Sequence, residues 1–205
     1  LNIITKDKSF DQNKLTLMKF TNENDTLHFI YLLPFSENQA LVESTVFSKS
    51  VFNENWYREK IKEFLVTSNI NSFKEVGTES GTIPMFFLTD KVSKNANIFN
   101  IGIRGGACKP STGYAFSFLI KQIQLIKKTN RNNINVHGFL EKKMDKVFIN
   151  YLKNNNESGA SFINLAKNLN GKEFQSFMMG KSNFITKLKI IKSMPKIPFI
   201  KALIG

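Results

Sequence analysis

The clearest pattern in the sequence is an aromatic and apolar run over residues 27–35, followed by three polar residues and a second run over 39–48 in which apolar and polar positions alternate. Branched and aromatic residues in short runs are typical of β-strands, and a short polar segment between two of them predicts a β-hairpin. In the second strand, alternation assigns one face to Ala40, Val42, Ser44 and Val46 and the other to Leu41, Glu43, Thr45 and Phe47.

Helical periodicity begins after Asn53, where apolar residues recur on one face to about residue 66. A strand-like return follows at 70–76, and Pro84 favours an extended backbone over 81–88. The pattern then predicts a short strand at 97–101. From residue 116 onward it predicts helices at 116–128, 141–153 and 161–169, and with weaker periodicity at 172–179 and 182–194.

The order of these elements predicts a mixed α/β chain whose sheet comes first and whose helices come last. We expect three regions: a sheet region 1–100, a loop and helix 101–130, and a helical region 131–205. No segment has the ~18 uncharged apolar residues of a membrane span. Because the sequence begins at Leu1 without a signal-peptide pattern, we expect it to be part of a longer protein. A single cysteine, Cys108, excludes an internal disulfide and fits a reducing cytoplasm.

Charge divides the chain unevenly. Residues 1–100 carry 11 Lys and Arg against 12 Asp and Glu, whereas residues 101–205 carry 18 against 4. From Lys181 to Gly205 there are six lysines and no acidic residue, and apolar residues alternate with them. A biased overall composition rich in Lys, Asn, Ile and Phe explains the excess without a function. Contact of this segment with an anionic membrane is the alternative.

The segment GIRGGACKPSTGYAF, residues 102–116, is unusually rich in glycine for a turn. It lies between a predicted strand and a predicted helix. Glycines there allow close backbone approach, and the amides at a helix N-terminus attract anions or a flat cofactor. A tight turn in which Ser111 or Thr112 caps the helix is the purely structural interpretation. The complete phosphate motifs GxxxxGK[ST] and GxGxxG are both absent.

Among candidate catalytic groups, Glu43 is the most interesting because it shares a strand face with large apolar residues. Such surroundings disfavour the charged form and raise the pKa of a carboxyl group. A strand-edge glutamate with its carboxylate in solvent is the alternative, and it applies equally to Glu79. No paired ligand spacing for a metal occurs, because His28, His137 and Cys108 are isolated in the sequence. The histidines are therefore interpreted as structural or solvated.

Four blocks, LLPFSENQALVESTVFS, ESGTIPM, GIRGGACKPSTGY and SMPKIPFIKAL, together resemble the C-terminal half of the flavin-dependent lycopene cyclases, in the family's order and over residues 32–203. The resemblance implies a hydroxylase-like FAD- and NAD(P)-binding flavoprotein fold. It also implies that the GxGxxG fingerprint lies upstream of these residues. The regions 1–100, 101–130 and 131–205 then become a substrate-binding sheet, a second flavin-contacting loop with its helix, and a basic, membrane-proximal part.

The resemblance also implies roles for individual residues. Glu43 matches the proposed acid/base glutamate of the family's FLEET-like motif, whereas the motif's second glutamate is Ser44 here. Arg104 would add positive charge beside a reduced flavin. The cofactor-binding set is Gly102, Arg104, Gly105, Gly106, Pro110, Ser111, Thr112 and Gly113. The substrate-binding set is Leu41, Phe47, Glu79, Pro84, Met85 and Tyr114.

The implied reaction is the non-redox, proton-initiated cyclisation of lycopene ends to β-ionone rings, with reduced FAD and NAD(P)H as its electron donor. The fragment by itself would be inactive. A peripheral location at the cytoplasmic face of a membrane follows from the insoluble substrate, and no nucleic acid partner is expected. An FAD-dependent monooxygenase or reductase acting on an isoprenoid lipid is the alternative enzyme. A basic module that binds membrane or nucleic acid is the non-enzymatic alternative.

Overall fold

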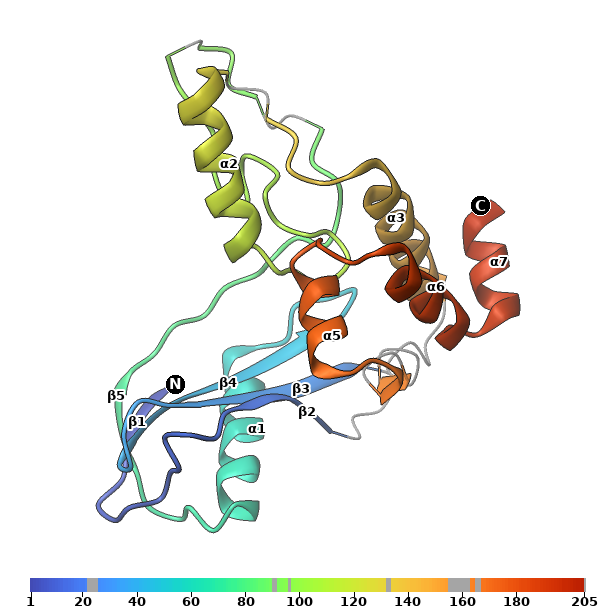
Figure 1. Ribbon diagram of the computed structural model, residues 1–205. Helices are drawn as coiled ribbons and strands as arrows, with labels where there is room; N and C mark the ends of the chain where they lie inside the picture. The colour runs from blue at the N-terminus through green and yellow to red at the C-terminus, as the bar shows by residue number, and fades with distance from the viewer. Residues whose placement is uncertain are drawn as a thin grey trace. The chain divides into compact units, whose positions relative to one another are not determined.

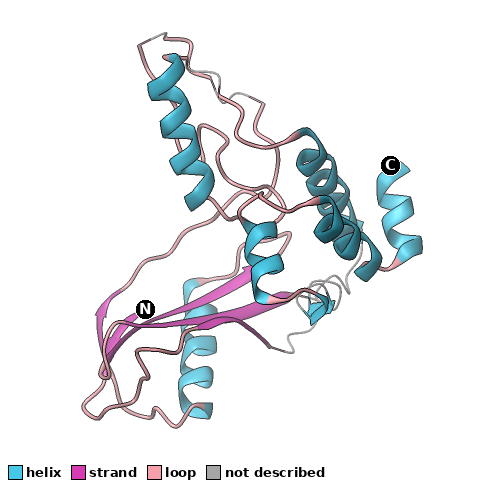
Figure 2. Ribbon diagram, in the orientation of Figure 1, coloured by secondary structure: helices cyan, strands magenta, loops and turns pink. Residues whose placement is uncertain are grey.

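The computed structural model describes residues 1–21, 26–89, 92–95, 97–131, 134–154, 163–164 and 167–204. The chain forms two compact units, Leu1–Thr82 and Ile83–Gly205. The first combines an antiparallel sheet with a helix, and the second is built from helices and loops (Figures 1 and 2). The prediction of a mixed α/β chain with its sheet first and its helices last is confirmed.

The first unit contains a five-stranded sheet in the order β2-β3-β4-β1-β5, in which every pair of neighbours is antiparallel. The predicted hairpin is confirmed as β3 and β4, paired from Leu27 opposite Phe47 to Pro34 opposite Ala40. The turn is held by Ser36 Oγ, which accepts from the amides of Asn38 and Gln39. The strands are β1 Asn2–Ile4, β2 Thr16–Phe20, β3 Leu27–Pro34, β4 Gln39–Phe47 and β5 Lys74–Gly77.

Helix α1, Glu54–Thr67, begins where the sequence predicts, because Asn53 Oδ1 caps it by accepting from the amide of Trp56 at 2.8 Å. Its apolar stripe lies across one face of the sheet (Figure 1). Each fully buried aliphatic or aromatic side chain there contributes about 1.5–3 kcal/mol. The core of the unit consists of Leu1, Ile3, Phe10, Ile30, Ala40, Val42, Ile61, Phe64, Leu65 and Ile70.

Most helices of the second unit follow the predicted periodicity closely, but the helix at Lys196–Ile204 was not predicted. The second unit contains two separate sets of apolar contacts. Phe118 of α2 packs with Ala107, Ile134 and Val136, and α3 packs on α7 through the rings of Tyr151 and Phe199, 4.4 Å apart. The helices are α2 Phe116–Thr129, α3 Phe139–Asn154, α5 Gly171–Met178, α6 Phe184–Ser193 and α7 Lys196–Ile204. Most of the helix predicted at 161–169 lies outside the described residues.

One predicted strand is wrong. Residues 97–101 form no strand, and Ile98 and Ile101 are half exposed. No neighbouring segment of the described chain offers them a ladder of hydrogen bonds, so the apolar residues there do not mark a strand. The strand-like return at 70–76 is shorter than predicted, because only β5 at its end pairs, with β1. Residues 81–88 form an irregular segment.

Candidate active site

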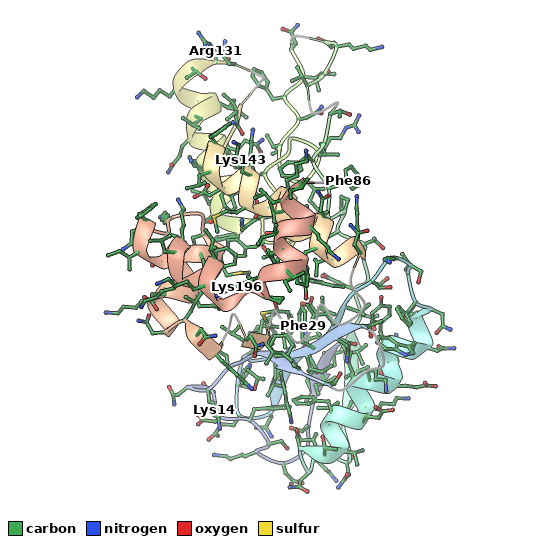
Figure 3. The ribbon with its side chains drawn as sticks, turned by 90° about the vertical axis from the view of Figure 1, so that its right-hand side faces the viewer. Lys14, Phe29, Phe86, Arg131, Lys143 and Lys196 are labelled. Carbon is green, nitrogen blue, oxygen red and sulfur yellow. The ribbon has the colours of Figure 1, made fainter. Side chains whose placement is uncertain are left out.

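Glu43 lies in β4 on the sheet face opposite α1. The face holds a cluster of aromatic rings: Phe29, labelled in Figure 3, contacts Phe20, Tyr31 and Phe47 edge-to-face at centroid distances of 5.3–5.8 Å. Tyr31 is the direct cross-strand partner of Glu43. The carboxylate therefore lies at the border of an aromatic surface, on the face that the alternation predicted.

The side chain of Glu43 is nevertheless exposed, and its Oε1 accepts a hydrogen bond from Thr45 Oγ1 at 2.9 Å. The apolar enclosure expected from the sequence is not provided by the sheet itself. Leu41 and Phe47, its neighbours on the same strand face, are partly buried. Glu79 is exposed beyond β5, so the sequence-based alternative of a carboxylate in solvent describes both residues in this unit.

Tyr31 is the titratable group closest in register to Glu43. Burial, and in second place the negative charge of Glu43, raise the pKa of Tyr31 to about 12. Its hydroxyl group therefore keeps its proton throughout the physiological range and remains a hydrogen-bond donor. The sequence analysis did not select Tyr31, although its place opposite Glu43 follows from the hairpin register.

The glycine-rich segment of the second unit is a compact turn held mainly by its own backbone. Gly102, Gly106 and Gly113 have φ values of +63°, +73° and +75°, which other residues rarely adopt. Gln122 of α2 clamps the turn. Its Oε1 accepts from the amide of Gly102 at 2.9 Å, and its Nε2 donates to the carbonyl of Gly105 at 2.8 Å.

Gly105 is required for lack of space and not for its backbone conformation. A Cβ at this position would lie 2.2 Å from the carbonyl oxygen of Asn100 and 2.7 Å from Gln122 Nε2. The close approach that this glycine permits is therefore made by the protein's own backbone. At Gly102, in contrast, a Cβ would meet nothing within 4 Å. Arg104, between them, is exposed.

The predicted cap of the following helix is wrong. The N-cap of α2 is Ala115, which offers no side-chain hydrogen bond, and the first intrahelical bond runs from the Leu119 amide to the Ala115 carbonyl. Ser111 cannot cap because its hydroxyl is buried and donates to Asp145 Oδ1 at 2.6 Å. Thr112 Oγ1 accepts only a long bond from the Tyr114 amide, at 3.4 Å.

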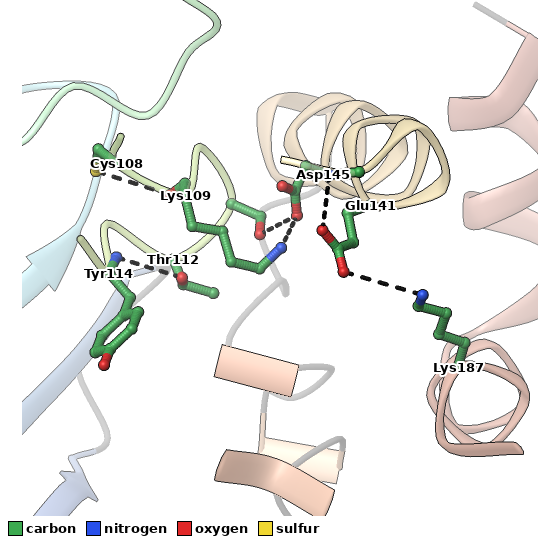
Figure 4. A network of polar contacts seen from close by, with 9 residues as sticks. Cys108, Lys109, Thr112, Tyr114, Glu141, Asp145 and Lys187 are labelled. Atoms are coloured by element: carbon green, nitrogen blue, oxygen red, sulfur yellow. Dashed lines mark hydrogen bonds and ion pairs between the residues drawn. The ribbon is translucent and has the colours of Figure 1, made fainter. Parts of the chain in front are cut away.

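Lys109 extends from the turn into the interior and forms an ion pair with Asp145 of α3 (Figure 4). Both side chains are about 2% exposed. Ser111 binds the same carboxylate oxygen, and on the next turn of α3 Glu141 faces Lys187 of α6 at 4.0 Å. The turn is thereby tied to α3 by buried polar contacts.

A cavity of about 170 Å³ lies between this turn and the segment before it. It brings Pro84, from the ESGTIPM block, together with Gly106 and Pro110 of the glycine-rich block. Most of its walls are apolar, and Cys108, His137 and Lys142 are its titratable groups. Met85 is half-buried beside Pro84, and Tyr114 packs edge-to-face on Phe118 instead. The lining residues are Pro84, Phe86, Phe87, Leu88, Ile103, Gly106, Cys108, Pro110, Asn135, His137 and Lys142.

The comparison with protein-family models matches residues 2–204 to a family described as lycopene cyclase protein. The chain belongs to the lycopene cyclase family. Membership indicates an enzyme of the cyclase type that acts on a carotenoid. The matched region includes both the sheet with Glu43 and the glycine-rich turn. Neither the comparison with curated proteins nor that with solved structures found a match.

Two features of this lycopene cyclase family member fit a flat ligand with polar edges at the glycine-rich turn. The amides at the start of α2 precede its first intrahelical bond, so they can donate elsewhere. In the same helical turn, Ser117 Oγ is buried and has no hydrogen-bond partner among the described residues. A ligand at this helix end would satisfy these groups, whereas Ser111 has its hydroxyl engaged by Asp145.

The remaining candidate nucleophile and bases of the cyclase serve the fold. Burial raises the pKa of the Cys108 thiol to about 11, and the thiol donates to the Gly113 carbonyl, so it is not a nucleophile near neutral pH. His28 is buried between the hydroxyls of Thr21 and Ser44. His137 is buried as well and contacts the Gly106 carbonyl through Nε2 at 3.1 Å. Both histidines agree with the structural interpretation.

His137 makes the stability of the cyclase depend on pH. Burial lowers its pKa, and the bond to Gly106 and the charge of Asp145 oppose this only in part. The unfolded chain therefore binds the proton more readily, so the contribution of neutral His137 is present above about pH 6.5 and is lost as the pH falls. We expect the urea concentration at half-unfolding to be lower at about pH 5.5 than at about pH 7.5. In His137→Gln, which keeps a hydrogen-bond donor, this decrease should be smaller. An equal decrease in the variant and the wild type would contradict the role of His137.

Proposed function

We propose that this chain carries the substrate-facing and second cofactor-contacting parts of a flavin-dependent lycopene β-cyclase, an enzyme of the intramolecular lyase type. The observation that supports it best is the carboxylate of Glu43 at the edge of an aromatic sheet face, in a chain of the lycopene cyclase family. A hydrocarbon substrate offers no hydrogen bonds, so it requires such an apolar face, and ring formation requires a proton.

In the proposed reaction, Glu43 delivers a proton to a terminal double bond of lycopene. The carbocation is attacked by a neighbouring double bond of the same chain, which closes the six-membered ring. The ring then loses a proton to the Glu43 carboxylate, which gives a neutral product and restores the acid, so no net oxidation occurs. When lycopene covers the sheet face, it excludes water from the side chain of Glu43.

The aromatic cluster beside Glu43 would stabilise the cation. The negative face of each well-placed ring contributes about 0.5–2 kcal/mol to a nearby positive charge. Tyr31 and Phe47, which are partly exposed, are each held edge-to-face against the buried ring of Phe29, so their orientation is fixed before substrate arrives. Leu41 and Phe47 extend the apolar surface along β4.

Reduced FAD, maintained by NAD(P)H, would assist protonation of the substrate when bound. The residues proposed to hold it are those of the turn from Gly102 to Gly113 and the first turn of α2, including Ser117. Pro84 lines the cavity next to this turn and would contact the substrate there, with Met85 beside it in the chain. Because no GxGxxG motif occurs in the sequence, we propose that a dinucleotide-binding part outside residues 1–205 completes the site and that these residues alone are inactive.

The test is expression of the complete gene product in a host that accumulates lycopene, followed by chromatography of its carotenoids. Cyclised product is expected only with the dinucleotide-binding part present. Absence of any cyclised carotenoid from the flavin-loaded complete protein would refute the proposed function. Oxygen consumption stimulated by an isoprenoid lipid would instead favour a monooxygenase.

We further propose that the cyclase contacts anionic lipid peripherally, at the cytoplasmic face of a membrane, through α6 and α7. No helix in the described part of the chain has the length and apolar character needed to cross a bilayer. The two helices nevertheless expose large apolar residues beside lysines, including Lys196, labelled in Figure 3. The apolar residues exposed by 40% or more are Phe184, Ile185, Leu188, Ile191, Ile197, Ile200, Leu203 and Ile204.

Vesicle sedimentation measures this contact. Each lysine near an anionic surface contributes about 1 kcal/mol, so Lys196→Ser with Lys201→Ser should weaken binding to phosphatidylglycerol vesicles about tenfold or more. Binding to neutral phosphatidylcholine vesicles should be weak in every case. Lys6→Ser with Lys14→Ser, which removes the same charge from the first unit, should leave binding unchanged. Equal losses in both double variants would mean that net charge alone is responsible.

A further inference from the structure

The ion pair of Lys109 and Asp145 is the most deeply buried charged contact in the described part of the second unit. Burying two charges costs several kcal/mol per ion before their attraction is counted, so such pairs contribute little net stability compared with apolar residues. Asp145 Oδ2 also has no hydrogen-bond partner among the described residues. Burying Asp145 is costly, and only one of its two carboxylate oxygens has a described hydrogen-bond partner. We therefore infer that it has a role other than stabilising the fold.

The contacts of Asp145 indicate that role. Its Oδ1 receives both the Lys109 ammonium and the Ser111 hydroxyl, which flank Pro110 in the chain. The backbone of Lys109 holds the rest of the turn. Its carbonyl accepts from the amides of Thr112 and Gly113 at 3.2 and 2.9 Å, and its amide donates to the Tyr114 carbonyl at 2.8 Å. One carboxylate therefore fixes both sides of the turn.

Asp145 is itself in a rigid place. It lies in the middle of α3, one turn before Phe148 and Ile149, which are buried. The same helix packs on α7 through the rings of Tyr151 and Phe199. The Lys109 ammonium is held from a further side by the ring of Phe177 in α5, 5.1 Å from its centroid. The turn is thus attached to two helices at one buried point.

The other side of the same turn borders the cavity, through Gly106, Cys108 and Pro110. We propose that Asp145 is a positioning residue: acting through Lys109 and Ser111, it holds the turn 108–113 in the shape that the ligand of the cyclase site requires. That this ligand is a flavin rests on the proposed function. The positioning itself is a property of this chain and is testable without a ligand.

Amide hydrogen exchange of the full chain tests the positioning. Asp145→Asn keeps the size of the side chain and removes its charge. We expect the amides of Thr112 and Gly113 to exchange at least about tenfold faster, whereas that of Met179, the C-cap residue of α5, stays unchanged. The matched control is Lys189→Met, which breaks the ion pair with Glu173 away from the turn. Unchanged exchange at Thr112 and Gly113 in folded Asp145→Asn overturns the proposal.

A second variant covers the case in which Asp145→Asn does not fold. Lys109→Met with Asp145→Leu replaces the ion pair by apolar groups of similar size, a change that buried pairs often tolerate. Ser111 then has no carboxylate to bind, so the turn should again lose protection while the helices keep theirs. Wild-type protection of the turn in this double variant overturns the proposal as well.

Flavin titration adds a functional readout. In Asp145→Asn joined to the dinucleotide-binding part, the dissociation constant for FAD should rise at least about tenfold and the visible absorption band of the bound flavin should change shape. Lys189→Met should alter neither. If the wild-type protein binds no flavin, the proposed function fails, and the exchange experiment still decides the role of Asp145. If FAD affinity and spectrum stay at wild-type values in folded Asp145→Asn, the turn does not depend on this carboxylate for its function.

Discussion

Replacing Glu43 by glutamine is expected to abolish ring formation in the complete enzyme and to leave its folding unchanged. Glutamine has the same size but carries no proton that it can deliver, and loss of a general acid lowers rates by roughly 10²–10⁴-fold. Glu43 is exposed, and its described hydrogen bond comes from Thr45, which glutamine can also accept. The free energy of unfolding should therefore change by less than about 0.5 kcal/mol.

Two further variants sharpen the assignment. Glu63→Gln removes a carboxylate from the solvent side of α1 and should leave product formation at the wild-type level. Glu79→Gln tests the other exposed carboxylate that the sequence selected. If carotenoid chromatography shows ring formation lost in Glu79→Gln and kept in Glu43→Gln, the acid has been assigned to the wrong residue. A flavin titration of Glu43→Gln should match that of the wild type.

Gly105→Ala is expected to destabilise the second unit by about 3 kcal/mol or more, a large effect for one methyl group. The added Cβ would lie 2.2 Å from the Asn100 carbonyl oxygen, which is backbone and cannot rotate away. It would also lie 2.7 Å from Nε2 of Gln122, the side chain that donates to the Gly105 carbonyl. Urea denaturation followed by circular dichroism measures the change in the free energy of unfolding.

Alanine substitutions at two other glycines separate the destabilisation caused by a steric clash from that caused by a left-handed backbone. Gly102 has open space around it but a φ of +63°, so Gly102→Ala should cost only the left-handed strain of about 1–2 kcal/mol. Gly171, at the start of α5, has open space and no positive φ, so Gly171→Ala should be neutral or slightly stabilising. A loss at Gly105 no larger than that at Gly102 would show that the turn relaxes around a methyl group.

Periodicity predicted the elements that carry their own local signals. The hairpin, α1, α2, α3, α5 and α6 were predicted from alternation or from the spacing of apolar residues, whereas α7 was not predicted. Strands β1 and β2 were not predicted. Strand β1 has three residues and pairs with distant segments, and β2 has five residues with an irregular register against β3. The segment 97–101 has the composition of a strand but pairs with no strand in the described part of the chain, which local sequence cannot reveal.

The sequence predicted the segments that form the site but not the side-chain contacts that join them. The sequence selected the strand face of Glu43 and the glycine-rich turn, and it placed Ser111 either at the cofactor or, as an alternative to Thr112, in a helix cap. Its hydroxyl is taken instead by Asp145, which lies on another helix. One signal was available: Asp145 precedes Phe148 and Ile149 by three and four residues, so an acid stands on the buried stripe of α3. An acid at such a position requires a buried partner.

The place of β1 in the sheet has a consequence for how the first unit folds. This three-residue strand lies between β4 and β5, so β5 joins the sheet only through it. Residues from opposite ends of the unit must therefore meet before the sheet is complete, whereas the β3–β4 hairpin can form from neighbours in sequence. Such nonlocal pairing has a high contact order and folds slowly. We expect the β1–β5 seam to form last and to open first under denaturant.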